Sequence, residues 1–441
     1  MAELDYLISE SWEALLPKLT PRRAEIPSAE RKAAVIIGMR RSGKTYRMYQ
    51  EIERLVSAGT DRRDILYVNF EDDRLQPARP ELPGDLLEVF YRANPAARRR
   101  GAHLLLDEIQ NVPGWSRFVR RVLDTETAHV ILSGSSAKLL HTEVATELRG
   151  RGLTMELFPF SFAEYVAASG EAPPETAVVG ARRRSILQAA CLDYLSIGGF
   201  PEVRGMPLAE RLQTLQDYVD LVLVRDVVER HGVQNVAAAR AFARLLLQSP
   251  ARSFSVNKAY ADLRSRGLSV SKDTLHALLD HFQDAYLVFA IPVFDRSVRV
   301  QATNPRKLYA IDPGLAAAMS HVTATDLGAR LENAVFLELR RRHGRLLRGE
   351  VCYYLTRAGR EVDFVVGDVF EHKAGRLVQA CASLADPATR AREVRALSEA
   401  LEETGLESGE IVTLEEAETI ETQAGTIHVV PAWRWFLDER R

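Results

Sequence analysis

The order of apolar and polar residues predicts alternating strands and helices over the first 170 residues. Short apolar runs occur at Ala33–Gly38, Ile65–Phe70, His103–Asp107 and His129–Gly134, and the stretches between them are long enough for helices. The last three runs are almost continuously apolar, as strands are when helices cover both faces of a parallel sheet. The pattern therefore predicts an α/β fold built on a parallel sheet, and the Leu157–Tyr165 stretch is expected to close this domain.

The pattern changes after a segment rich in proline and glycine at Gly170–Gly180. Two long helices are expected at about Arg182–Ser196 and Leu208–Arg230. Between Ala237 and Val300 we expect three helices and a hairpin, because apolar residues recur there with helical spacing.

The expected hairpin pairs a strand at Tyr286–Pro292 with a return strand near Val298–Gln301. Three helices followed by such a hairpin have the order of a winged helix. The last segment, Asp326–Arg441, reads as helix, three strands, helix and strand, which predicts a small α/β module.

Composition narrows the classes of protein that these elements can form. Hydrophobic residues make up 46% and charged residues 27% of 441 residues, a balance typical of globular proteins. The net charge is -2, so any contact with nucleic acid must come from local basic patches. Cys191, Cys352 and Cys381 lie far apart, which argues against a structural zinc site or disulfides. With neither a signal-like start nor a long apolar run, a cytoplasmic protein without a membrane partner is expected.

A phosphate-binding motif follows the first predicted strand. Residues 38–45 read GMRRSGKT, which fits G-x-x-x-x-G-K-[ST] between a strand and a helix. The two glycines are expected to free the backbone so that N–H groups converge on phosphate oxygens. The motif predicts ATP and Mg²⁺ as cofactors, with Lys44 on the β- and γ-phosphates and Thr45 on the metal. The candidate nucleotide-binding residues are Gly38, Arg40, Arg41, Ser42, Gly43, Lys44, Thr45 and Tyr46.

Polar residues at the ends of the other strands complete a hydrolytic site. Asp107 and Glu108 follow the apolar strand HLLL, where ligands gather in parallel sheets. Asp107 is predicted to bind magnesium, and Glu108 to orient or deprotonate the attacking water. Ser133 could contact the γ-phosphate or the water, although simple turn chemistry also explains it. Asn69 could hold Glu108 away from the water.

Two arginines, Arg149 and Arg151, follow the helix predicted at Ala137–Glu147 in the sequence LRGRG. In an AAA+ arrangement an arginine here would reach the ATP of a neighbouring subunit and stabilise the transferred phosphoryl group. The alternative is a solvated helix end, where arginine is favoured by the helix dipole.

The motifs GMRRSGKT, DEIQNVPGW, LSGSSAKLL, FPFSFAEY and GGFPEV, in this order, resemble a family of archaeal and bacterial AAA ATPases with a C-terminal nuclease-like domain of unknown function. The later segments YAIDPGL, LENAVFLEL and GREVDFVV extend the resemblance over nearly the whole chain. That family also resembles signalling ATPases that switch between ADP and ATP states. That resemblance implies that Pro201, in Gly199-Phe200-Pro201, packs on the adenine ring, although a plain helix–helix loop is the alternative.

The pattern and the resemblance together predict five parts. We expect a helical leader at 1–30, a P-loop AAA+-like ATPase core at 31–170 and a helical lid at 171–235. A winged helix at 236–310 and a nuclease-like α/β domain at 311–441 complete the expected chain. Length supports several domains, because one hydrophobic core rarely organises more than about 300 residues.

The C-terminal module resembles the PD-(D/E)xK nuclease fold, in which a helix Glu, a strand Asp and a Glu-x-Lys pair bind metal and activate water. Glu332 and Asp363 match the first two positions, but Gln379 and Cys381 stand where Glu and Lys are needed. Glutamine brings no negative charge to a metal, and cysteine does not polarise water as lysine would. We expect an inactive nuclease in which Glu332 and Asp363 remain as hydrogen-bond acceptors.

An ATP-regulated nuclease is the alternative for this module. Glu371, His372 and Lys373 form a literal Glu-x-Lys. They are expected at the tip of a hairpin, with side chains directed away from Asp363.

DNA is a candidate partner through the predicted winged helix. Its presumed recognition helix carries Lys272 and His276 but also Asp273 and Asp280, which would repel phosphate. The basic residues expected around the wing are Arg296, Arg299, Arg306 and Lys307. Packing against the nucleotide domain is an alternative role for such a domain.

Two functions therefore remain open besides the nuclease. The first is an ATPase that works as a homo-oligomer and acts on DNA. The second is a slow ATP/ADP switch that recruits a protein partner.

Overall fold

The computed structural model describes residues 2–135, 146–171, 179–320, 327–344 and 350–438. The chain forms two compact units, Met1–Leu157 and Phe158–Arg441, called here the first and the second unit. Across the described ranges, every helix is too short or too polar to cross a membrane.

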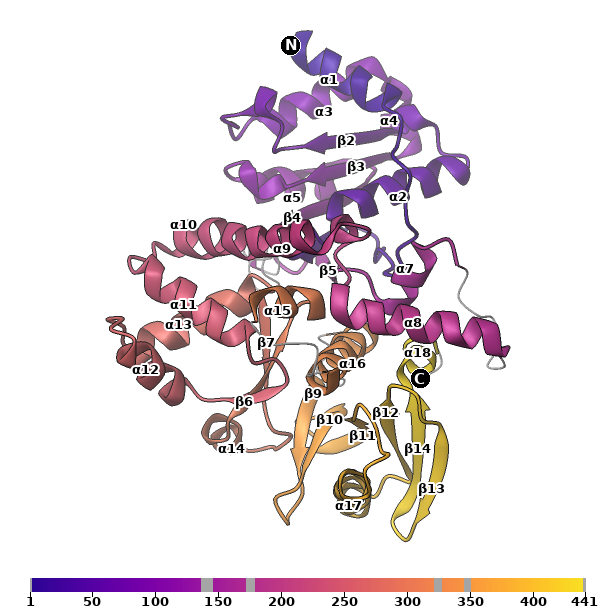
Figure 1. Cartoon of the computed structure of the whole chain (residues 1–441). Coiled ribbons are helices and arrows are strands. Elements are labelled where there is room, and N and C mark those ends of the chain that lie inside the picture. Colours follow the sequence, from indigo (N-terminus) through magenta and orange to yellow (C-terminus); the bar gives the residue numbers. More distant parts are fainter. Residues whose placement is uncertain (1, 136–145, 172–178, 321–326, 345–349, 439–441) are drawn as a thin grey trace. The chain divides into compact units, whose positions relative to one another are not determined.

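The first unit is built on a five-stranded parallel sheet in the order β2-β3-β4-β1-β5 (Figure 1). This confirms the predicted α/β fold with a parallel sheet. The strand β5 was not predicted, because its sequence GLTME is short and polar at alternate positions. The strands are β1 Ala33–Gly38, β2 Ile65–Asn69, β3 Ala102–Asp107, β4 Ala128–Ser135 and β5 Gly152–Glu156.

The N-terminal helix packs on the same unit. The indole nitrogen of Trp12 donates to the carbonyl of Ile65 at 3.2 Å, and its ring centroid lies 6.1 Å from that of Phe90. The helix predicted at Ala137–Glu147 lies outside the described residues except for its last two positions. The described helices are α1 Ala2–Glu13, α2 Lys44–Ser57, α3 Leu82–Ala93, α4 Pro95–Arg100 and α5 Trp115–Thr125.

The second unit begins with α7, Phe162–Ala167, a short helix that was not predicted. The next helices agree with the prediction, and α8 spans Ala181–Ile197. The helix α9, Leu208–Val222, continues through a π-helical turn, Leu223–Val228, into α10, Glu229–His231.

Next comes a helical group with a three-stranded antiparallel sheet in the order β6-β8-β7. The predicted return strand near Val298–Gln301 is wrong. That segment is a helix, because the Ser297 hydroxyl caps it by accepting from the Val300 N–H at 3.3 Å. The partner of β7 is instead β8. The elements are α11 Val236–Leu247, β6 Arg252–Phe254, α12 Val256–Ser265, α13 Lys272–Asp284, β7 Val288–Ile291, α14 Val298–Thr303 and β8 Arg306–Ala310.

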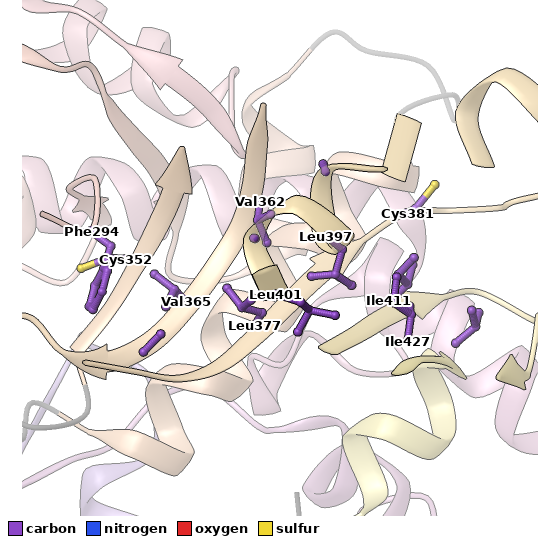
Figure 2. Packing of buried hydrophobic residues seen from close by; sticks show 14 of the residues in the cluster. Phe294, Cys352, Val362, Val365, Leu377, Cys381, Leu397, Leu401, Ile411 and Ile427 are labelled. Carbon is purple, nitrogen blue, oxygen red and sulfur yellow. The ribbon is translucent and has the colours of Figure 1, made fainter. Parts of the chain in front are cut away.

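The last part contains a six-stranded mixed sheet in the order β13-β14-β12-β11-β10-β9. Leu397 and Leu401 of α17 lie in one buried cluster with Leu377 of β11 and Ile411 of β12 (Figure 2). Burial of each such side chain stabilises the fold by about 1.5–3 kcal/mol. The elements are α15 Pro313–Met319, α16 Leu327–His343, β9 Glu350–Leu355, β10 Glu361–Asp368, β11 Lys373–Ala380, α17 Pro387–Thr404, β12 Ser408–Thr413, β13 Glu418–Thr422, β14 Gly425–Pro431 and α18 Ala432–Leu437.

A buried carboxylate joins distant turns of the second unit. Asp312 caps α15 by accepting from the Leu315 N–H at 2.9 Å, and its other oxygen accepts from the Gly199 N–H at 2.6 Å. Burial raises the pKa of Asp312 to about 6, although the backbone N–H groups oppose the shift. The turn that leads to Pro201 is thereby held against the start of α15.

We expect Asp312→Asn to change how stability depends on pH. The folded protein keeps the Asp312 proton up to about pH 6, whereas the unfolded chain loses it near 3.8. The contribution of this group is thus present below about pH 4 and is lost as pH rises through about 6. The stability of the wild type relative to the variant should fall by about 3 kcal/mol between those pH values. Urea unfolding across this range measures it, and a difference that is independent of pH would contradict the assignment.

Candidate functional site

The candidate site lies at the carboxyl edge of the sheet in the first unit. Asn69 at the end of β2 is the register partner of Asp107 at the end of β3, and Gly38 at the end of β1 is paired with Ser135 of β4. Because these strands are parallel, the residues that follow them gather at one edge, where ligands bind in such sheets.

The loop after β1 has the backbone that its glycines were expected to allow, but only at one of them. Gly43 has φ +99° and precedes the first residue of α2, Lys44. Gly38 is required for a different reason than the predicted backbone freedom. A β-carbon on Gly38 would lie 2.2 Å from the carbonyl oxygen of Leu157, so only glycine lets these two backbone segments approach.

The Lys44 side chain folds back across this loop and is buried. Its ammonium donates to the carbonyl oxygens of Gly38 at 3.1 Å and Met39 at 3.3 Å. It also lies 3.8 Å from a carboxylate oxygen of Glu108. The loop therefore holds a positive charge next to the acidic pair, where a nucleotide phosphate would need it.

Asp107 receives hydroxyl groups from three different elements. Thr45 donates to its Oδ2 at 2.7 Å, Tyr67 donates to the same oxygen at 3.1 Å, and Ser133 donates to its Oδ1. Asp107 is fully buried, and burial raises its pKa, while the hydroxyl groups of Ser133 and Thr45 act in the opposite direction. The carboxylate is thus poised to gain from a nearby cation.

Tyr67 is a member of this cluster that the sequence reasoning missed. It lies two residues before Asn69 in β2, and alternate residues of a strand point to the same face. The two-residue spacing from Asn69 is the signal in the sequence that could have identified Tyr67, because it places both side chains on the same face of β2.

Glu108 follows β3 in a left-handed backbone conformation with φ +52°. Its N–H donates to the Ser133 hydroxyl at 3.2 Å, and its carboxylate accepts from the Gln110 amide. A non-glycine residue in this conformation carries a modest energetic cost, which is typical of functional turns. Ser133 therefore bridges both acidic residues in this structure.

The other candidate residues of this edge have varied surroundings. The amide oxygen of Asn69 accepts from the Glu71 N–H at 2.9 Å, and Arg40 lies 3.3 Å from the Glu71 carboxylate. Arg41 and Tyr46 are exposed. The buried Ser42 hydroxyl has no hydrogen-bond partner within the described parts of the chain.

The predicted arginines lie elsewhere on the first unit. Arg151 directly precedes β5, and its carbonyl accepts from the Ala33 N–H at 2.8 Å, at the amino ends of β5 and β1. Its guanidinium pairs with Asp124 and is 40% exposed. Arg149 is exposed and has φ +50°. Pro201 belongs to the second unit, where it begins a 3-10 turn and is half-buried.

The residues present fit a nucleotide with magnesium. The unpartnered Ser42 hydroxyl, the converging helix start at Lys44 and the cationic loop are suited to phosphate. Thr45 and Asp107 offer one hydroxyl and one carboxylate, the few protein ligands that Mg²⁺ takes when phosphates supply others. The described residues contain no group of three or more His, Cys, Asp or Glu side chains able to hold a metal ion.

Comparison with known proteins agrees with this geometry. Residues 30–166 match the family model of an AAA domain, and residues 188–326 match a domain of unknown function (DUF8612). An uncharacterised protein of Methanocaldococcus jannaschii is 32% identical over 95% of this chain and 91% of its own length. The chain belongs to that protein's family, whose AAA domain is a P-loop ATPase domain.

Two further proteins are similar to this AAA-type ATPase at lower sequence identity. An uncharacterised Haemophilus influenzae protein is 28% identical over 70% of this chain and 74% of its own length. Among solved structures, a Walker-type ATPase of Pyrococcus abyssi is 14% identical, with a TM-score of 0.43, over 72% of this chain and 94% of that protein. The Methanocaldococcus jannaschii and Haemophilus influenzae proteins are both uncharacterised, so their names identify neither a substrate nor a partner.

Lys44→Ala should weaken ATP binding by about 10–100-fold, because it removes a charged donor to phosphate. Lys32→Ala is the matched control, since Lys32 is exposed and stands just before β1, at the opposite end from the loop. Titration with a fluorescent ATP analogue measures affinity, and circular dichroism verifies folding. Unchanged affinity in a folded Lys44→Ala protein would remove the nucleotide assignment.

Proposed function

We propose that the first unit binds ATP with Mg²⁺ and hydrolyses it. The observation that carries the proposal is the contact of the loop with the acidic pair: Thr45 donates to Asp107 at 2.7 Å, and Lys44 lies 3.8 Å from Glu108. Phosphate-binding, metal-binding and water-activating groups are thus within reach of one phosphoryl group. This geometry is what phosphoryl transfer requires, since positioning and electrostatic stabilisation supply most of its catalysis.

Each side chain has a proposed role in that step. Lys44 exchanges its carbonyl contacts for the β- and γ-phosphates, and Thr45 and Asp107 hold the metal. Bound Mg²⁺ would neutralise charge on the phosphates. Glu108 orients or deprotonates the attacking water. Ser133, which donates to the Asp107 carboxylate and accepts from the Glu108 backbone N–H, links the two acidic residues and lies where it could sense the γ-phosphate.

Asn69 is proposed to restrain Glu108 before hydrolysis. It ends the strand beside Asp107, which places it near the acidic pair. Its side-chain oxygen must leave the Glu71 N–H or its amide nitrogen must act instead.

Glu108→Gln should preserve ATP binding but lower turnover by about 10²–10⁴-fold, the usual contribution of a general base. The variant keeps the size and the Gln110 contact of the side chain but cannot accept a proton. Single-turnover assays with radiolabelled ATP should show bound, uncleaved nucleotide. If Glu108→Gln instead lost affinity as severely as Lys44→Ala, the water-activating role would be wrong.

We further propose that the active form is a homo-oligomer in which Arg151, or else Arg149, acts on the ATP of a neighbouring subunit. Arg151 stands at the amino end of β5, which is parallel to β1, whereas the loop follows the carboxyl end of β1. Five residue steps along a strand span about 17 Å, more than an arginine side chain reaches. An arginine so placed can stabilise transferred phosphate only in another copy of the chain.

Mixing two inactive variants should restore part of the activity. A Lys44→Ala subunit keeps its arginine but lacks a working loop, and an Arg151→Ala subunit keeps its loop but lacks the arginine. In mixed assemblies some interfaces pair an intact loop with an intact arginine. The ATPase rate of the mixture should exceed that of either variant, and the wild-type rate per subunit should fall on dilution. No rescue together with a rate independent of dilution would exclude the trans arginine, and Arg149→Ala repeats the test at the second candidate.

Action on DNA is proposed as the task of the second unit. The order α11-β6-α12-α13-β7-α14-β8, with its three-stranded sheet, resembles that of a winged helix, although helix α14 lies between the two strands expected to form the wing. Arg296, Arg299 and Arg306 are exposed near its sheet. Lys307 is removed from the predicted basic cluster, because it is buried and ion-paired. The exposed face of α13 carries Asp273 and Asp280 beside Lys272 and His276. Because the two carboxylates would repel phosphate, the exposed arginines are the better candidates for contact with the DNA backbone.

A slow ATP/ADP switch remains the second candidate. The observation in its favour is that Asp312 holds the Gly199 turn, and thus the segment leading to Pro201, against α15. A change in the position of Pro201 would in that way be passed through the Gly199 turn to α15. Hydrolysis stimulated by duplex DNA supports action on DNA, whereas tightly retained ADP without stimulation supports the switch.

The C-terminal module is proposed to be a nuclease-like domain without nuclease activity. Gln379, at the position that needs an acid, donates to Glu393 at 2.6 Å and accepts from the Asp363 N–H at 3.1 Å. Glu371 and His372 lie in the turn between β10 and β11, as predicted, and Lys373 begins β11.

A further inference from the structure

Lys307 is a buried lysine surrounded by carboxylates of the second unit. Only 2% of it is exposed, although it is one residue from the exposed Arg306. Its ammonium lies 2.6 Å from Glu332 Oε1, 2.8 Å from Glu361 Oε1 and 2.9 Å from Asp363 Oδ1. Lys307 comes from β8, Glu332 from α16, and the other two from β10. We call these four residues the Lys307 centre.

Each N–H group of the Lys307 ammonium has a carboxylate acceptor. An ammonium has three donors, and each faces a different carboxylate. The oxygen of Glu332 that faces the lysine also accepts from the Tyr309 hydroxyl at 2.8 Å, and Asp363 Oδ2 accepts from the Ala380 N–H at 2.9 Å. Two of the three carboxylates, those of Glu332 and Asp363, are therefore also held by a second donor.

The charge balance of the centre favours a retained cation. One ammonium faces three carboxyl groups, so the pKa of Lys307 is raised well above its ordinary value by these acids, despite burial. Burial, and then the charge of Asp363, raise the pKa of Glu332. The neutral Gln379 beside Asp363 adds no further negative charge. A fourth carboxylate at that place would face the same single ammonium.

We propose that Lys307 is the permanent cation of this centre and occupies the position that a divalent metal ion would need. The Lys307 centre is then closed to Mg²⁺ while the P-loop site of the first unit is open to it. The ammonium also fastens β8 to α16 and β10. The sequence showed only that Gln379 and Cys381 replace the acid and the lysine of a nuclease. The proposal adds that the Lys307 ammonium fills the place of the metal ion.

Manganese binding to the nucleotide-free, full-length protein tests the proposal. Free Mn²⁺ is quantified by electron paramagnetic resonance, and melting temperature is followed in the same titration. Wild type and Asp363→Asn should bind the same amount of Mn²⁺, because the centre takes none. Lys307→Ala should melt about 5–10 °C lower, since it leaves buried carboxylates without their cation, and Mn²⁺ should restore part of that loss.

The matched controls separate the lysine from its neighbourhood. Arg306→Ala removes an exposed cation one residue away and should melt within about 1 °C of wild type, with no added response to Mn²⁺. The double variant Lys307→Ala/Asp363→Asn should lose the Mn²⁺ response of Lys307→Ala. If Lys307→Ala does not fold, the double variant Lys307→Ala/Glu332→Gln tests the proposal instead. It removes one carboxyl group together with the ammonium and should therefore fold.

Three results would overturn the proposal. The first is Mn²⁺ binding by wild type that Asp363→Asn abolishes. The second is a Lys307→Ala protein that melts like wild type or is indifferent to Mn²⁺. The third is a Lys307→Ala/Glu332→Gln protein that is no more stable than Lys307→Ala. Because the readouts are metal binding and melting, they do not depend on whether the first unit hydrolyses ATP.

Discussion

The candidate site depends on the burial of one carboxylate, that of Asp107. A charge removed from water must be satisfied by hydrogen bonds, or folding loses several kcal/mol. Asp107 meets this requirement with hydroxyl groups from Thr45 on α2, Tyr67 on β2 and Ser133 on β4. The sheet places β3 between β2 and β4, with β1 beside β4, and this order brings those elements together. The strand order and the position of the loop thus supply the hydrogen bonds that one buried carboxylate needs.

The chain solves the same problem differently in its second unit. At Asp107 the donors are neutral hydroxyl groups that bring no positive charge of their own, so the buried carboxylate would gain from an added cation. At Asp363 the donor is the Lys307 ammonium, which brings its own positive charge and fills the space. Both carboxylates are buried, yet one centre is suited to a metal–nucleotide complex and the other is not. The difference lies in the charge of the donor, which no count of acidic residues reveals.

Local motifs could be predicted from the sequence, whereas contacts between distant segments could not. The P-loop and the strand before Asp107 are continuous in the chain, so their spacing alone specifies strand, loop and helix. Tyr67 joins the site through a strand pairing, and Lys307 joins its centre across 25 residues to Glu332 and 56 to Asp363. The strand predicted near Val298–Gln301 was wrong because a local cap outweighed the strand propensity of the residues. Valine favours a strand, but the Ser297 side chain caps a helix that begins at Val298. Roles of the site residues stay predictions, since placement alone does not show chemistry.

Buried polar contacts explain why the second unit is one compact body although the residue pattern divides it into lid, winged-helix-like and α/β parts. Asp312 holds the Gly199 turn against α15, and Lys307 joins β8 to α16 and β10. The half-buried Arg341 of α16 donates to the carbonyls of Pro159 at 3.0 Å and Phe160 at 3.3 Å. Separating any of these parts would leave a charge or a carbonyl unsatisfied in the interior, at a cost of several kcal/mol.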